Sequence, residues 1–299
     1  FLKAYNIHLC LLKTIFQKHL FQQNPPLPEQ MSPERWRDLP CGIQRFDTWQ
    51  SDHITCHMTY SSATRASPTK PGKTSRAWLR RRTATTAILM VAVPRHDLKS
   101  APGQRAERGV DLVTPEWHSL GAAFGITAGG RLTTDWIYSI SSGPTPIIAY
   151  PSPSPNRLNV APLPVPTAAF PSGGIPWLMD HAIGGSPMLI KDGEVRVTDQ
   201  EELIEINNTT PRARSAIGHT ASGIVLLVAA EGDNSPGPAG FNLVQFAHLL
   251  HTLGCVGAIN LDGGGSTSLV VSGRRTVRPS DGNERPVISA LLLIDPQTQ

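Results

Sequence analysis

The sequence lacks any uninterrupted apolar run of about 18 residues, so no membrane-spanning helix is expected. It also lacks a clear secretory signal, because Lys3, Lys13 and Lys18 interrupt the apolar residues of the first segment. The chain begins with Phe1 rather than Met, which indicates a fragment or a processed start. No internal repeats are visible, and the 299 residues suit one large domain or two small ones.

Cysteine is scarce, and its spacing does not support a zinc site. The four cysteines are Cys10, Cys41, Cys56 and Cys255, and no two of them have the spacing of metal ligands. Cys255 lies in an apolar segment and is interpreted as a small buried residue. The sequence also lacks a Gly-x-Ser-x-Gly elbow and a Gly-Lys-[Ser/Thr] loop, which argues against a serine hydrolase and a nucleotide P-loop.

Positive charge is concentrated in the first third of the chain. Residues 1–110 hold 17 Lys and Arg against 7 Asp and Glu, a net charge of +10, whereas residues 111–299 have a net charge of −6. Arg80 to Arg82 form the only tight basic cluster, and no stacking pattern of aromatics accompanies it. We therefore interpret residues 1–110 as a poorly determined basic segment, solvated or disordered, and expect no nucleic-acid partner.

What the sequence does contain is a glycine loop between two apolar runs. Ile259–Leu261 leads into Asp262, and Gly263–Gly265 precedes three hydroxyl residues and the apolar Leu269–Val271. This pattern predicts a strand, a tight loop at the end of a sheet, and a second strand. Glycines leave the backbone N–H groups unshielded, so a ligand can approach closely. The alternative is a plain glycine hairpin in which Asp262 only forms the turn.

The flanking residues predict a helix and several hairpins. Asn242 followed by Gln245 is typical of a capping box, and Gly254 marks the helix end before a strand over 256–261. A helix start is expected over 198–203 because acidic residues lie in its first turn. Hairpins are expected over 121–139, 188–197 and 214–230, and the Pro- and Ser-rich residues 141–174 predict a functional rim or a cover over the sheet.

Four sequence blocks, in this order, resemble the phosphodiester glycosidase family. Together they cover roughly Trp177 to Asp295, and Phe124 to Pro171 more weakly. The blocks are Gly184–Gly193, Arg214–Gly218, Asn260–Thr267, and Arg278–Gly282 with Arg285–Val287. The resemblance implies an α+β fold with a mixed β-sheet, hairpins and a few packed helices. It implies a single catalytic-type domain over residues 111–299.

One family feature is absent from the first third. The family places a strand ending in an Asn-Gly-Gly loop there, and the nearest candidate by position is the apolar run Ala87–Val93. A frameshift would explain this difference, because codons for Ile88–Ala92 exist whose neighbouring frame spells Asn-Gly-Gly. The alternatives are an ordinary buried strand and a divergent or chimeric first segment.

The resemblance implies cleavage of a sugar 1-phosphodiester of the GlcNAc-α-1-phosphodiester kind, which releases free sugar and a phosphomonoester. Such a site needs a carboxylate near the sugar, with a cation and N–H donors near the phosphate. Asp262 is the candidate carboxylate, and it could stabilise the oxocarbenium-like centre, activate water or ligate a cation. Arg214 offers a planar fork for phosphate oxygens.

The remaining candidate residues would bind substrate or phosphate. Arg285 is a second phosphate ligand or, equally, the partner of Asp281 or Glu284 in a salt bridge. The other candidates are Asn260, Gly263, Gly264, Gly265, Ser266 and Thr267 of the glycine-loop block, with Gly185 and Ser186 of the first block.

The sequence requires no cofactor, although a divalent cation at Asp262 is an alternative. The expected partner is a carbohydrate phosphodiester, such as a bacterial surface or teichoic-type polymer. The resemblance implies export to the periplasm or cell surface. A different function is also consistent with the sequence: a non-catalytic protein that binds glycan or phosphate and has lost the Asn-Gly-Gly half of the site.

Overall fold

The computed structural model describes residues 7–13, 43–47, 118–127, 129–140, 147–179, 181–206, 208–233, 239–271, 274–283 and 285. Its strands are β1 (Ile7–Lys13), β2 (Ile43–Asp47), β3 (Gly121–Ile126), β4 (Leu132–Ser139), β5 (Ile147–Tyr150), β6 (Ile175–Pro176), β7 (His181–Gly184), β8 (Met188–Lys191), β9 (Glu194–Val195), β10 (Arg214–Thr220), β11 (Ile224–Ala230), β12 (Cys255–Leu261), β13 (Val270–Val271) and β14 (Arg274–Arg275). Its helices are α3 (Leu243–Thr252) and the short 3₁₀ turn η3 (Gly264–Ser266). The run Ala87–Val93, with its hypothetical Asn-Gly-Gly frame, lies outside the described residues.

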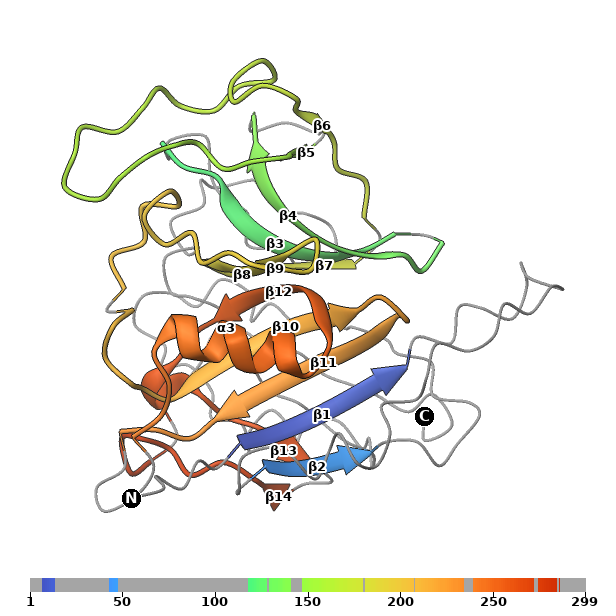
Figure 1. The fold of residues 1–299 in the computed structure, drawn as a ribbon, viewed down its shortest axis with the longest axis vertical. Helices are drawn as coiled ribbons and strands as arrows, with labels where there is room; N and C mark the ends of the chain where they lie inside the picture. Colours follow the sequence, from blue (N-terminus) through green and yellow to red (C-terminus); the bar gives the residue numbers. More distant parts are fainter. Residues whose placement is uncertain are drawn as a thin grey trace, which may run out of the picture.

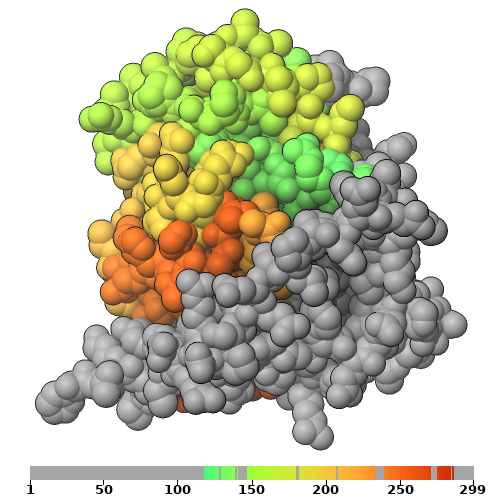
Figure 2. Space-filling view, turned by 45° about the vertical axis from the view of Figure 1, so that its right-hand side comes forward, coloured from blue at the N-terminus to red at the C-terminus, as the bar shows by residue number. Residues whose placement is uncertain are grey.

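Two sheets lie one above the other (Figure 1). The larger has seven strands in the order β2-β1-β11-β10-β12-β8-β9, and the smaller has five in the order β6-β5-β4-β3-β7. The pairing of β1 with β2 is parallel, so the larger sheet is mixed. Figure 2 shows the same layering on one face of the molecule, with the green smaller sheet above the orange residues of the larger one.

Alternation along β11 shows how the larger sheet buries both faces. Val225 and Leu227 belong to the apolar core shared with the smaller sheet, whereas Leu226 and Val228 belong to the core under α3. Successive side chains of a strand point to opposite faces, so one apolar run fills both layers. Helix α3 closes this second core, into which it buries Phe246 and other apolar side chains.

The capping box predicted for α3 is confirmed. The side chain of Asn242 accepts a hydrogen bond from the Gln245 N–H at 2.8 Å, and the Gln245 side chain accepts one from the Asn242 N–H at 3.2 Å. Gly254, with φ of 90°, follows the helix in the left-handed conformation that a C-terminal glycine favours. The chain then enters β12, which leads to the glycine loop.

The expected fold class is confirmed in its sheets and corrected in its helices. Within the described residues α3 is the only α-helix, so the fold is dominated by β-structure. The helix expected at 198–203 is wrong, because this segment forms turns and Leu203 has φ of 53°. Glu202 is 1% exposed, so its carboxyl group points into the protein rather than to solvent.

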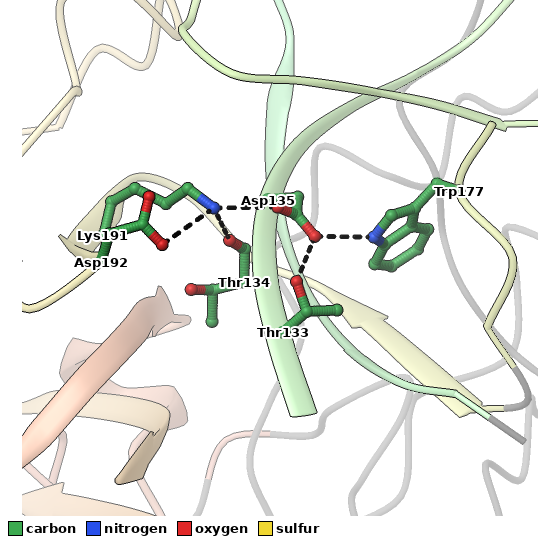
Figure 3. A network of polar contacts seen from close by, with 6 residues as sticks. All are labelled: Thr133, Thr134, Asp135, Trp177, Lys191 and Asp192. Carbon is green, nitrogen blue, oxygen red and sulfur yellow. Dashed lines mark hydrogen bonds and ion pairs between the residues drawn. The ribbon is translucent and has the colours of Figure 1, made fainter. Parts of the chain in front are cut away.

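Polar contacts as well as apolar ones join the two sheets. The ammonium group of Lys191, at the end of β8, donates to the Thr134 carbonyl at 2.8 Å and to Asp135 Oδ1 at 2.9 Å, both on β4 (Figure 3). Asp135 Oδ2 also accepts hydrogen bonds from the Thr133 hydroxyl and from Trp177 Nε1. This network joins β8 of the larger sheet to β4 of the smaller sheet.

Candidate functional site

At one end of the larger sheet, the start of β10 lies beside the last residues of β11 and β12. Arg214, the first residue of β10, pairs with Ala230, the last residue of β11, and Ser215 pairs with Leu261, the last residue of β12. Asp262 therefore follows β12 beside the start of β10. The Gly264 N–H donates to the Ala213 carbonyl at 2.8 Å, so the Asp262 loop lies against the residue that precedes β10.

Asp262 is partly exposed, and its Oδ1 accepts a hydrogen bond from the Gly263 N–H at 2.9 Å. The chain then forms η3, in which the Ser266 N–H donates to the Gly263 carbonyl at 3.1 Å. The N–H groups of Gly263 and Gly264 are thus engaged within the protein, and Gly265 is a buried residue of η3.

Gly265 is also where a second segment approaches the loop. A Cβ built on Gly265 would lie 1.9 Å from Asp281 Oδ2, so any side chain there would displace the carboxylate. Asp281 Oδ2 in turn accepts hydrogen bonds from Arg285 Nη2 at 2.6 Å and Nε at 3.1 Å. Of the two alternatives for Arg285, its salt bridge to Asp281 is confirmed, and a contact with phosphate stays a prediction.

Arg214 is buried at the same edge, with 3% of its surface exposed. Its Nε donates to the Phe241 carbonyl at 3.1 Å. Burial and the neighbouring charge of Arg212 lower the pKa of Arg214 to about 10, while Asp233 acts in the opposite direction. Arg214 is therefore cationic at neutral pH and supports the backbone before α3, and its role as a phosphate ligand stays a prediction.

The Gly184–Gly193 block packs on the last residues of β12. Asn260 Nδ2 donates to the Ser186 carbonyl at 2.9 Å, and the Asn260 N–H donates to the Pro187 carbonyl at 3.0 Å. A Cβ on Gly185 would lie 2.4 Å from the Asn260 carbonyl oxygen, so only glycine allows this approach. Gly185, Ser186 and Asn260 therefore lie together, directly before Asp262.

Three buried polar atoms around this loop have no hydrogen-bond partner among the described residues. They are Ser215 Oγ, Asn260 Oδ1 and Thr267 Oγ1, and their residues are at most 3% exposed. Most buried polar atoms in proteins are hydrogen-bonded, because leaving one unpaired costs about 1–3 kcal/mol. Ser215 pairs with Leu261 and Asn260 with Ala216, so the side chains of Ser215 and Asn260 point to opposite faces of the larger sheet near the loop.

Sequence reasoning missed Glu231, which follows β11 as Asp262 follows β12. Glu231 is 6% exposed, and its Oε1 accepts a hydrogen bond from the Arg278 N–H at 2.6 Å. A carboxylate directly after an apolar strand was the signal that singled out Asp262, and the same signal applies to Glu231. This contact fixes the segment that carries Asp281.

Other expectations are answered only in part. Cys255 is 2% exposed, as predicted, and burial raises the pKa of its thiol to about 12. Among the described residues, no three His, Cys, Asp or Glu side chains gather to hold a metal ion. No helix in the described part of the chain is long and apolar enough to cross a membrane.

Comparison with known proteins places the chain in a family. The model of the phosphodiester glycosidase family matches residues 103–294, which is more than half of the sequence, so the chain belongs to this family. Over 110 residues, 33% of this chain, it is 33% identical to mouse N-acetylglucosamine-1-phosphodiester alpha-N-acetylglucosaminidase, of which the match covers 21%.

Two further proteins are similar to the chain, one in sequence and one in fold. Over 108 residues, 36% of this chain, it is 32% identical to the SPbeta prophage-derived uncharacterized protein YomE of Bacillus subtilis, covering 16% of that protein. The catalytic domain of the zebrafish N-acetylglucosamine-1-phosphodiester alpha-N-acetylglucosaminidase, auto-inhibited by its pro-peptide, superposes with a TM-score of 0.46 at 20% identity. That superposition covers 75% of this chain and 67% of the zebrafish chain.

Proposed function

We propose that this protein hydrolyses a sugar 1-phosphodiester and releases free sugar and a phosphomonoester. The observation that carries the proposal is the Asp262 loop, where a partly exposed carboxylate follows the buried end of β12 and precedes a turn of three glycines beside Arg214. Membership of the phosphodiester glycosidase family supports the same chemistry. The curated relatives are matched over about a fifth of their length or less, so the reaction is proposed for this chain rather than transferred.

In the proposed reaction, water adds to the anomeric carbon as the bond from that carbon to the phosphate oxygen breaks. Positive charge develops on the sugar, and Asp262 stabilises it or takes a proton from the water. The leaving group is a phosphomonoester, a weak base that departs without strong protonation. This explains how one carboxylate can suffice where most glycosidases use a pair.

The phosphate group of the substrate would lie near the two arginines at this end of the sheet. Arg214 and Arg285 supply positive charge, and the Gly265 N–H with the hydroxyls of Ser266 and Thr267 supplies hydrogen bonds. Arg285 would reach the phosphate while it holds Asp281 over Gly265. Asn260, with Gly185 and Ser186 behind it, would fix the direction in which Asp262 leaves β12.

We further propose that turnover needs no cofactor, with a cation at Asp262 as the alternative. Full activity after dialysis against EDTA is the expected result, and recovery only on addition of a divalent cation would contradict it. We also propose an exported bacterial protein whose natural substrates are cell-surface phosphodiester polymers. Labelling with a reagent that does not enter the cytoplasm tests this location in the source cell.

The deciding experiment is incubation with a synthetic N-acetylglucosamine 1-phosphate diester, followed by chromatographic measurement of free sugar. Release by the wild-type protein and none by Asp262→Asn supports hydrolysis. Saturable binding of the intact diester with no release from the wild type would favour the non-catalytic binding protein. Release that is equal in both proteins would leave Asp262 as a turn residue.

A further inference from the structure

Glu202 is a buried carboxyl group surrounded by hydrogen-bond donors. Its Oε1 accepts from the Met188 N–H at 2.7 Å, the Thr198 hydroxyl at 2.6 Å and Trp136 Nε1 at 3.3 Å. Its Oε2 accepts from the Ala122 N–H at 3.1 Å. A carboxylate can only accept, whereas a protonated carboxyl group must also donate. This ring of donors therefore suits the ionised form of Glu202.

The donors come from both sheets, so Glu202 lies at their junction. Ala122 and Trp136 belong to β3 and β4 of the smaller sheet, and Met188 begins β8 of the larger one. The Ser186 hydroxyl also forms a hydrogen bond with Glu202. One carboxylate thus holds the Ser186–Met188 turn against the smaller sheet.

This turn is the support on which the end of β12 rests. The Ser186 and Pro187 carbonyls accept both the side-chain and the backbone donors of Asn260. Met188 pairs with Ile259, three residues before Asp262. A shift of the turn would therefore move Asn260, and the backbone that places Asp262 would move with it.

We propose that ionised Glu202 is a positioning residue that sets the Asp262 loop in its reactive geometry through Ser186 and Asn260. This role rests on the proposed hydrolysis of a sugar 1-phosphodiester. Glu202 does not itself touch substrate, because its side chain is enclosed by the five groups that bind it. Small displacements of supporting residues are known to cost enzymes large factors in rate.

The ionisation of Glu202 is finely balanced. Burial raises its pKa to about 7, although the hydrogen bonds of Thr198, Met188, Ser186 and Ala122 act in the opposite direction. Among these donors, only the hydroxyl groups of Ser186 and Thr198 can accept a hydrogen bond from a protonated carboxyl group. Protonation of Glu202 must therefore reverse one of these two hydrogen bonds, and the hydroxyl group has to rotate. Activity should then fall as Glu202 takes up a proton near neutral pH.

Neighbouring charges do not replace Glu202 in this behaviour. Strand β3 contributes no charged side chain, and the charges on β4 and β8 are those of Asp135 and Lys191, which pair with each other at 2.9 Å. The other charged residues of the surrounding described segments are Arg196, which lies over the Trp136 ring, and Asp199, Glu201 and Glu205 of the turn.

The test compares Glu202→Gln with Asp135→Asn on the sugar 1-phosphodiester assay between pH 5 and 8. Glu202 is buried and Asp135 partly buried, both at the sheet junction, but Asp135 lies at the far end of β12 from Asp262. At pH 8 we expect Glu202→Gln to lower kcat about 10-fold or more with little change in KM, because one donor then faces an amide NH₂. Asp135→Asn should keep kcat within about 2-fold of wild type.

The pH profile separates positioning from simple loss of stability. Wild-type kcat should fall toward pH 5 with a midpoint near the Glu202 pKa of about 7, until it approaches that of Glu202→Gln. Glu202→Gln should lack this midpoint. Thr198→Val, which keeps the carboxyl group but removes a hydrogen bond to its charged form, should move the midpoint to higher pH.

Three results would overturn the proposal. The first is a Glu202→Gln profile equal to wild type, and the second is an equal loss of kcat in Asp135→Asn. If Glu202→Gln fails to fold, an unmoved midpoint in Thr198→Val overturns it. A wild-type protein that releases no sugar at any pH overturns the proposed hydrolysis and this role together, which distinguishes that failure from the others.

Discussion

The polar groups near the start of β12 are hydrogen-bonded to one another, whereas buried polar atoms near its end lack a described partner. At the start of the strand, Gly257 lies under the rings and hydroxyls of its neighbours, since a Cβ there would be 2.4 Å from both His219 Nε2 and Thr134 Oγ1. Beside it, Asp135 has donors on both carboxylate oxygens (Figure 3). At the other end, Ser215, Asn260 and Thr267 each bury a polar atom without a described partner.

This difference separates structural from functional polarity. Asp262 is five positions beyond Gly257, about 16 Å along an extended strand, so the two ends do not share groups. At the first end the polar atoms satisfy one another and tie the sheets together. At the second end three buried polar atoms have no partner among the described residues, and the carboxylate of Asp262 is partly exposed to solvent.

The largest expected effect is that of Asp262→Asn. The amide keeps an oxygen to accept the Gly263 N–H but loses the negative charge, so kcat should fall at least about 10³-fold. The melting temperature should change by no more than about 2 °C, because the side chain is partly exposed. Single-turnover kinetics and thermal unfolding measure the two quantities, and substantial remaining turnover would contradict the assigned role.

Gly265→Ala should have the next largest effect. Its Cβ would collide with Asp281, so the segment that Arg285 and Glu231 hold over the loop must move. We expect kcat/KM to fall about 10- to 100-fold. Gly282→Ala is the matched control, because Gly282 has φ of 77° and open space around its Cβ position. The control should show only the strain of about 1 kcal/mol, measured by urea unfolding, and retain activity.

Lys191→Met tests the satisfied end of β12. Removing the ammonium group leaves Asp135 without its ionic partner, and the lysine and aspartate side chains are only 15% and 17% exposed. Unfolding free energy should fall by about 2–3 kcal/mol, while kcat stays within about 2-fold. A loss of kcat as large as that of Gly265→Ala would show that the two ends are coupled.

The elements that the sequence predicted are those with local signals. The capping box of α3 lies within four consecutive residues, and the Asp192-Gly193 turn is set by two residues with φ of 52° and 84°. Strand β11 was predicted from an uninterrupted run of apolar residues. In each case the residues that determine the structure are neighbours in the chain.

The site was predicted only as far as such signals reach. The position of Asp262 at the end of an apolar strand was visible, but the contact of Asp281 with Gly265 depends on segments that meet only in the fold. Glu202 was misread for the same reason. Acidic residues after Thr198 are typical of a helix start, yet the donors that draw Glu202 inward come from residues 122, 136 and 188.

The smallest expected effect concerns pH and the stability of the satisfied end. Burial by itself would raise the pKa of Asp135, but the Thr133 hydroxyl, Lys191 and Trp177 outweigh it and hold this pKa below 3.8. A carboxyl group with a lowered pKa in the folded state stabilises the protein above its unfolded-state pKa, and this contribution is lost as the pH falls toward the folded-state value. The stability difference between wild type and Asp135→Asn should therefore be constant above about pH 5 and shrink by about 1 kcal/mol at lower pH. Urea unfolding at pH 6 and pH 3 measures it, with Asp192→Asn as the control because the Asp192 side chain is 84% exposed.

If the difference widened as the pH fell, Asp135 would be held protonated in the folded protein. The network at the start of β12 would then be neutral, and the contrast with the Asp262 end would need a different physical basis.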